Sequence, residues 1–163
     1  MADFLPVEAN KAHILMVRPA TQGTSLEDAN AEWVEVFVDL SSDLANWRLQ
    51  HLRGRWREET AKPVEWEWIY TWGSPAFVNA GEVYRIHSGS RVRAATHPVT
   101  DDLAPGRKHV YAAGPTGAAR LVWTKGDYVR LLDAFGTVID EVVVWPQEPP
   151  SAETKPAEAP AAR

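Results

Sequence analysis

The sequence predicts an all-β fold in which two antiparallel sheets, with about nine strands in total, pack face to face. Short stretches rich in β-branched and aromatic residues recur along the chain, and most of them alternate apolar with polar residues. Glycine, proline and asparagine separate these stretches where the chain must reverse. Helix signals are confined to Thr24–Glu27, whose pattern suits a capping box and one or two helical turns.

Each strand candidate is short and bounded by turn residues. Glu32–Asp39 and Tyr128–Asp133 alternate most clearly, as strands with one buried face do. The full set in chain order is Ala12–Arg18, Glu32–Asp39, Trp47–Arg57, Val64–Trp72, Glu82–His87, His109–Ala112, Arg120–Trp123, Tyr128–Asp133 and Val138–Trp145. Turns are expected between them at Asn79–Gly81, Ala104–Gly106, Gly114–Gly117 and Lys125–Asp127.

The clearest predicted hairpin runs from Leu131 to Ile139. Asp133 is expected to open a type I turn there, and Gly136 is expected to close it at positive φ. This turn joins the last two predicted strands and fixes their register.

Length and composition predict one domain with short tails. The chain has 163 residues, which suits a single compact domain, expected here over residues 12–145. Residues 1–11 form an N-terminal tail. Residues 146–163 contain five prolines and five alanines, too little apolar surface to offset ordering entropy, so a disordered tail is expected.

Charge and cysteine usage narrow the function classes. The net charge is −5, from 17 Lys+Arg against 22 Asp+Glu, which disfavours a generally basic nucleic-acid or membrane binder. The absence of cysteine excludes thiolate catalysis, cysteine-ligated zinc, iron–sulfur clusters and disulfides. The start of the chain lacks the pattern of a signal peptide, and no apolar run is long enough to span a membrane. We therefore expect no membrane association and a cytoplasmic location.

The most unusual segment is Val64–Trp72, which contains three tryptophans. As a strand it would place Val64, Trp66, Trp68, Tyr70 and Trp72 on one face. Upstream, Arg53, Arg55 and Arg57 also share a face. A hairpin register that sets Arg55 beside Trp66 and Arg53 beside Trp68 would allow cation–π contacts.

Three interpretations of this aromatic stripe stay open. It can be a core face with arginines at its edge. Part of it can be exposed and bind a protein partner, with a contact set of Trp66, Trp68, Trp72, Arg53, Arg55 and Arg57. The same groups can bind single-stranded nucleic acid, with a patch extended by Arg85, Arg91, Arg93, Arg107 and Lys108. Carbohydrate binding by the tryptophans is a more distant alternative.

No arrangement in the sequence supplies a nucleophile, a base and an orienting group together. The five histidines, His13, His51, His87, His97 and His109, lack the spacing of a helical metal pair. We therefore expect no enzyme, no metal, no cofactor and no small-molecule substrate.

Four segments in order, Glu32–Val36, Leu44–Leu49, Phe77–Ile86 and Trp123–Asp140, resemble the lamin tail domain. This resemblance implies an immunoglobulin-like β-sandwich without catalytic residues. It further implies an interaction module of the kind found in nuclear lamins and attached to bacterial hydrolases. Trp47 is expected between the sheets, and Ala80-Gly81 in a tight turn. The richness in Ala, Arg, Pro and Trp suits a GC-rich bacterial source.

Overall fold

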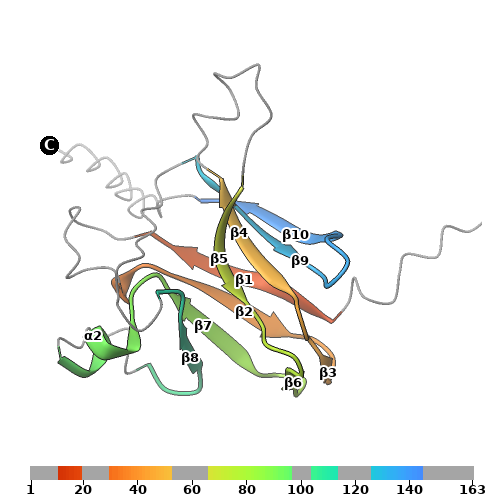
Figure 1. The fold of residues 1–163 in the computed structure, drawn as a ribbon, viewed down its shortest axis with the longest axis horizontal. Helices are drawn as coiled ribbons and strands as arrows, with labels where there is room; N and C mark the ends of the chain where they lie inside the picture. Colours follow the sequence, from red (N-terminus) through yellow and green to blue (C-terminus); the bar gives the residue numbers. More distant parts are fainter. Residues whose placement is uncertain (1–10, 20–29, 53–65, 97–103, 114–125, 145–163) are drawn as a thin grey trace, which may run out of the picture.

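The computed structural model describes residues 11–19, 30–52, 66–96, 104–113 and 126–144. These residues form an all-β sandwich, as the sequence predicts, with ten strands and one short helix in the described ranges (Figure 1). Two four-stranded sheets enclose the core, and a third sheet of two strands lies at one end.

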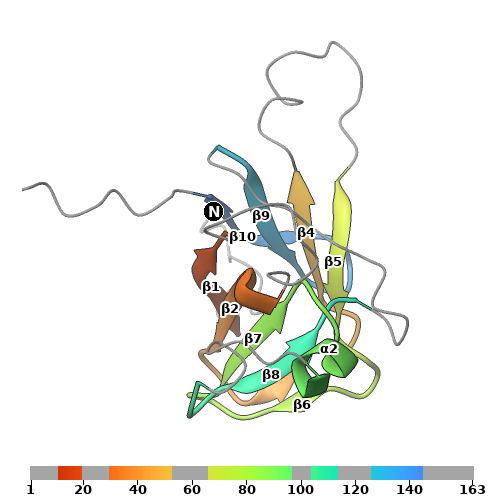
Figure 2. The same ribbon diagram turned by 90° about the vertical axis from the view of Figure 1, so that its left-hand side faces the viewer.

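The first sheet has the strand order β1-β2-β7-β8. The strands are β1 (Ala12–Arg18), β2 (Trp33–Val38), β7 (Val83–His87) and β8 (Lys108–Tyr111). Neighbours are antiparallel except β7 and β8, which are parallel and depart from the expected antiparallel pattern. Parallel neighbours need a crossover connection. That connection contains α2 (Arg91–Thr96), a helix that the sequence analysis did not predict (Figure 2).

The second sheet has the order β10-β9-β4-β5, with antiparallel neighbours throughout. Its strands are β10 (Val138–Val143), β9 (Tyr128–Leu132), β4 (Arg48–Leu52) and β5 (Glu67–Thr71). The two-stranded sheet pairs β3 (Ser42–Asp43) with β6 (Phe77–Val78). Two-residue strands are too short to show a periodic pattern, which explains why the sequence did not predict β3 and β6.

The core is built from the inward side chains of both large sheets. Trp47 is 1% exposed and belongs to this core, as expected from the sequence. Aliphatic residues surround it: Val34, Val36 and Ile86 from the first sheet, and Leu49, Val129 and Leu131 from the second. Burial of such side chains is the main favourable contribution to folding.

Strand β2 is buried on both faces, and this differs from the half-buried strand that its alternation predicts. Val34 and Val36 point into the core, yet Glu35 on the opposite face is only 2% exposed. The same holds in β7, where Ile86 lies in the core and Arg85 is buried on the other side. The outer face of the first sheet is therefore covered.

The hairpin between β9 and β10 has the predicted turn. Asp133 Oδ1 accepts hydrogen bonds from the backbone N–H groups of Phe135 and Thr137, at 2.9 and 2.8 Å. Gly136 has φ +84°, and its N–H donates to the Asp133 carbonyl. The turn at Ala80-Gly81 is also confirmed, with Gly81 at φ +88° and its N–H bonded to the Val38 carbonyl.

A side-chain contact joins the two sheets along one side. The Asp140 carboxylate of β10 accepts a hydrogen bond from the backbone N–H of Ile14 in β1, at 2.8 Å. The pairing of β1 with β2 shifts between Ile14 and Met16, so β1 carries an irregularity next to this contact. The carboxylate occupies a backbone donor of a strand at the edge of its sheet.

Several sequence predictions lie outside the described residues. They are the tail over residues 1–10, the capping box Thr24–Glu27, the C-terminal part of the strand Trp47–Arg57, the strand Arg120–Trp123 and the tail over 146–163. In the described ranges, no helix combines the length and apolarity needed to cross a membrane.

Candidate functional site

The outer face of the second sheet presents two tryptophans, each beside an arginine. The Arg130 guanidinium lies 3.9 Å from the centroid of the Trp66 ring, and that of Arg48 lies 5.1 Å from Trp68. Arg130 also donates a hydrogen bond from Nε to Gln50 Oε1 at 2.9 Å. We call Arg48, Gln50, Trp66, Trp68 and Arg130 the Trp–Arg face.

Sheet register explains why these side chains meet. Gln50 in β4 is paired with Trp68 in β5 on one side and with Arg130 in β9 on the other. Paired residues of antiparallel strands point to the same face, so one row crosses three strands. Leu49 and Leu131, the neighbours of this row, point into the core.

The aromatic stripe does not lie on one face as the sequence predicted. The pairing of β4 with β5 shifts between Leu49 and Gln50, a β-bulge that reverses the alternation of β5. Trp68 is 54% exposed on the outer face, whereas Ile69 and Trp72 are in the core. Trp72 is 2% exposed and contacts Tyr70 edge to face, so it is a structural residue and not a partner contact.

The predicted arginine partners of the tryptophans are also corrected. Trp68 is paired with Gln50, which differs by three residues from the register that would set it beside Arg53. Among the described residues, the cations that stack on Trp66 and Trp68 are Arg130 and Arg48. Arg53, Arg55 and Arg57 themselves lie outside the described residues.

The two arginines of the Trp–Arg face have different electrostatic surroundings. Arg130 is paired in register with Glu141 of β10, so an acidic residue lies next to it on the same face. In the described part of the chain, Arg48 forms no ion pair with a carboxylate. Its guanidinium instead makes a cation–π contact with the Trp68 ring. The positive charge of Arg48 is therefore not neutralised within the described sheet.

A buried histidine lies under one end of this face. His51 Nδ1 is 3.2 Å from Glu67 Oε2, and its Nε2 is 3.1 Å from Asp127 Oδ2. The His51 side chain is 1% exposed and that of Asp127 4%. This bridge connects β5 and the start of β9 to β4, and it anchors β5 at Glu67, between the two tryptophans.

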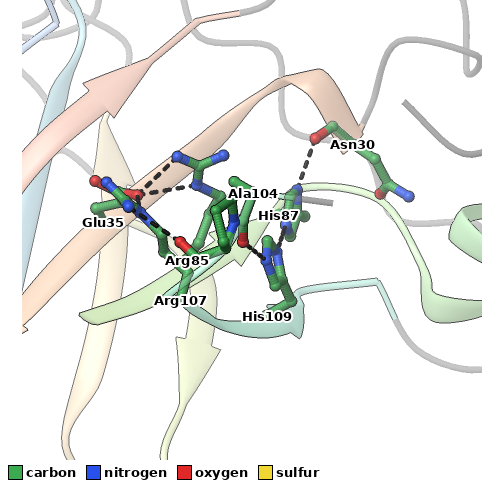
Figure 3. Close-up of polar contacts among 8 residues, drawn as sticks. Asn30, Glu35, Arg85, His87, Ala104, Arg107 and His109 are labelled. Atoms are coloured by element: carbon green, nitrogen blue, oxygen red, sulfur yellow. Dashed lines mark hydrogen bonds and ion pairs between the residues drawn. The ribbon is translucent and has the colours of Figure 1, made fainter. Parts of the chain in front are cut away.

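A second polar cluster covers the outer face of the first sheet (Figure 3). Glu35 Oε1 accepts hydrogen bonds from Arg85 Nε and Nη2, at 3.0 and 2.8 Å, and from Arg107 Nε at 2.8 Å. The Arg85 guanidinium also lies 3.9 Å from the centroid of the Trp33 ring. Charge-assisted bonds of this kind hold β2, β7 and the start of β8 together.

Next to this cluster, two histidines lie side by side. His87 Nδ1 is 2.6 Å from the Asn30 carbonyl oxygen, and His87 Nε2 is 2.8 Å from His109 Nδ1. His109 Nε2 is 2.9 Å from the Ala104 carbonyl oxygen (Figure 3). The two rings are nearly coplanar, with an interplanar angle of 20°. Tyr111 covers His87, with ring centroids 4.9 Å apart.

Two cations of the extended basic patch considered for nucleic acid are paired within the fold. Arg85 is 6% exposed and held by Glu35. Lys108 pairs with Glu82 at 2.8 Å. The hydrogen bond from Lys108 is the main cause that lowers the pKa of Glu82 to about 2, and the same contact raises the pKa of Lys108. Cations neutralised within the fold cannot serve phosphates without breaking these contacts.

The sequence contains part of the pattern that places the Glu35–Arg85–Arg107 cluster beside the His87–His109 pair. Arg85 and His87 are two residues apart in β7, as are Arg107 and His109 at β8, so each pair shares a face. The sequence could not show that β7 and β8 are neighbours, which places Arg85 beside His109. Within the described ranges, no group of three His, Asp or Glu side chains is arranged to hold a metal ion.

Comparison with family models and with curated proteins finds no match. The function must therefore be inferred from the geometry of this chain.

Proposed function

We propose that this chain is a non-catalytic interaction module that binds a protein partner through the Trp–Arg face. The observation that carries the proposal is the pair formed by Trp68 and Arg48. Trp68 is 54% exposed, and the stacked Arg48 has no carboxylate partner among the described residues. Tryptophan and arginine are the residue types most enriched in binding hot spots.

The sheet also fixes these side chains before binding. Arg130 is held between Gln50 and the Trp66 ring, and Trp68 is on a strand paired with β4. Ordered side chains lose less entropy when a partner binds, which favours affinity. The partner segment that fits best offers an apolar group to Trp68 and a carboxylate to Arg48.

A nucleic-acid partner is supported less well. The chain has a net charge of −5, and Glu141 is paired with Arg130 on the same face. An acidic residue beside one of two arginines repels phosphate. Stacking of bases on Trp66 and Trp68 remains the alternative that the experiment below addresses.

The proposal includes the lamin-tail-like character of the domain, together with a bacterial source and a cytoplasmic location. What supports the lamin-tail-like character is the order of the resembling segments along the chain. Glu32–Val36 falls mostly in β2, Leu44–Leu49 leads into β4, and Phe77–Ile86 covers β6 and most of β7. Such domains act as interaction modules, in agreement with the proposed role.

The test compares the full chain with two variants as bait in pull-downs from a bacterial lysate. The double variant Trp68→Ala and Arg48→Ala removes the central pair of the face. Phe135→Ala is the matched control, because Phe135 is an aromatic residue that is 87% exposed in the β9–β10 turn. A specific partner should be captured by wild type and control and bound about tenfold or more weakly by the double variant.

Two outcomes would contradict the proposal. Capture that is equal for wild type and double variant would exclude the Trp–Arg face. Titration of a single-stranded oligonucleotide at two salt concentrations tests the alternative: binding that falls with salt and is lost with Arg48→Ala would assign the face to nucleic acid.

A further inference from the structure

Three hydrogen bonds of His87 and His109 form a chain with a carbonyl oxygen at each end. The order is Asn30 carbonyl, His87 Nδ1, His87 Nε2, His109 Nδ1, His109 Nε2 and Ala104 carbonyl, with contacts of 2.6, 2.8 and 2.9 Å (Figure 3). A carbonyl oxygen only accepts hydrogen bonds. The two terminal nitrogens must therefore both carry protons.

Counting protons shows what the central contact needs. His87 Nδ1 and His109 Nε2 each donate to a carbonyl, and the contact between His87 Nε2 and His109 Nδ1 needs one more proton. The four nitrogens thus require three protons, whereas two neutral imidazoles carry two. With two protons only, two lone pairs face each other at one of the three contacts.

We propose that His87 and His109 together hold one proton more than two neutral imidazoles, and that this proton fastens the Ala104 turn and β8 to the first sheet. His87 is fully buried, while His109 is partly exposed and gives water access to the pair. Loss of the proton breaks one of the three bonds. The simplest bond to lose is that from His109 to Ala104, at the edge of the structure.

The charged groups around the pair come from each strand packed against it. Glu35 of β2 neutralises part of the charge of Arg85 in β7 and Arg107 next to β8. Glu32 accepts a hydrogen bond from Ser88, directly after His87. Two glutamates and two arginines thus lie on the strands around the pair. Tyr111 contributes its ring to His87 and no charge at neutral pH.

The sign of the pH dependence follows from this proton. Above about pH 6.5, the ordinary pKa of histidine, the folded pair holds a proton that the unfolded histidines have lost, so this contribution to stability decreases as the pH rises further. In the range where the pair titrates, the folding equilibrium constant should fall by up to about tenfold per pH unit.

The first measurement is the protonation state of each histidine in the full-length protein, by NMR of ¹⁵N-labelled imidazoles between pH 5 and 8. At low pH, both His109 nitrogens and only Nδ1 of His87 should carry protons. As the pH rises, β8 amides should lose hydrogen-exchange protection relative to β1, the opposite edge of the same sheet. Two neutral rings, with one proton on each histidine throughout this range, would overturn the proposal without any variant.

The second measurement is stability against pH for wild type and His109→Gln. Wild type should lose stability with rising pH more steeply than the variant. His51, which lies between Glu67 and Asp127, is present in both proteins, so its contribution cancels in the difference. His13→Gln is the matched control, because His13 is an exposed histidine paired with Asp39. This variant should lose stability with rising pH as steeply as wild type does. Equal slopes for wild type and His109→Gln would contradict the shared proton.

Discussion

The two outer faces of the sandwich both stack arginine on tryptophan, in very different surroundings. On the first sheet, Arg85 lies over Trp33 and donates two hydrogen bonds to buried Glu35. On the second sheet, Arg48 lies over Trp68, which is 54% exposed, with no carboxylate beside it in the described residues. The same pair of residue types is therefore part of the fold on one face and available for contact on the other.

This difference shows what to look for when a stacked arginine is judged as a binding residue. The distance to the ring does not decide, because Arg85 and Arg130 are both 3.9 Å from their tryptophans. The hydrogen-bond acceptors near the guanidinium decide whether it can bind a partner. A guanidinium bonded to a buried carboxylate stabilises the fold, whereas one without such a carboxylate is available for binding.

The largest expected effect is a difference in stability loss between variants on the outer faces of the two sheets. Glu35→Ala removes the carboxylate that Arg85 and Arg107 share, and it leaves the buried Arg85 guanidinium without this partner. The free energy of unfolding should fall by about 3–5 kcal/mol, measured by urea denaturation. Arg48→Ala is the control and should cost less than about 1 kcal/mol. Similar losses for both variants would remove the distinction between the faces.

A smaller effect is expected where the covered face meets the loop before β2. A Cβ on Gly89 would lie 1.8 Å from Asn30 Oδ1, and Asn30 also donates to the Ser90 carbonyl. Gly89→Ala should lower the free energy of unfolding by about 1–3 kcal/mol. Gly73→Ala, where a Cβ meets nothing within 4 Å, should change it by about 0.5 kcal/mol or less. If Gly89→Ala changes the free energy of unfolding as little as Gly73→Ala does, this end of the covered face is loosely packed.

The smallest effect concerns Glu82 and Lys108, at the edge of the first sheet. The pKa of Glu82 is lowered from 4.5 to about 2, mainly by Lys108, and the Glu82 side chain is 19% exposed. Its stabilisation is therefore complete above about pH 4.5 and is lost as the pH falls toward 2. Glu82→Gln should cost about 0.5–1 kcal/mol at pH 7, and less at pH 3. A difference that grows on acidification would contradict this assignment.

The sequence predicts the strands better than it predicts their faces. The bounds of β1 and the turn from Asp133 to Gly136 follow from local patterns, because alternation and turn residues act over a few positions. The parallel pairing of β8 could not be predicted, since it depends on a crossover. The bulge in β5 was also missed, because it arises from pairing with β4.

The candidate site was predicted in part for the same reason. Trp68 was expected to meet Arg53, and the arginine that it meets among the described residues is Arg48. The partner depends on register, which one shifted residue changes. Arg130 reaches Trp66 from β9, a strand about 60 positions further along the chain, and no local pattern indicates such a contact.

The Asp140 carboxylate has a consequence for how this protein behaves at high concentration. It occupies the Ile14 N–H on β1, a donor that an incoming strand from another molecule would otherwise use. A charged group at that position also repels a flat apolar strand that approaches the same edge. The bond therefore acts against self-association into extended sheets, and its removal should first be seen as aggregation, before any change in the fold.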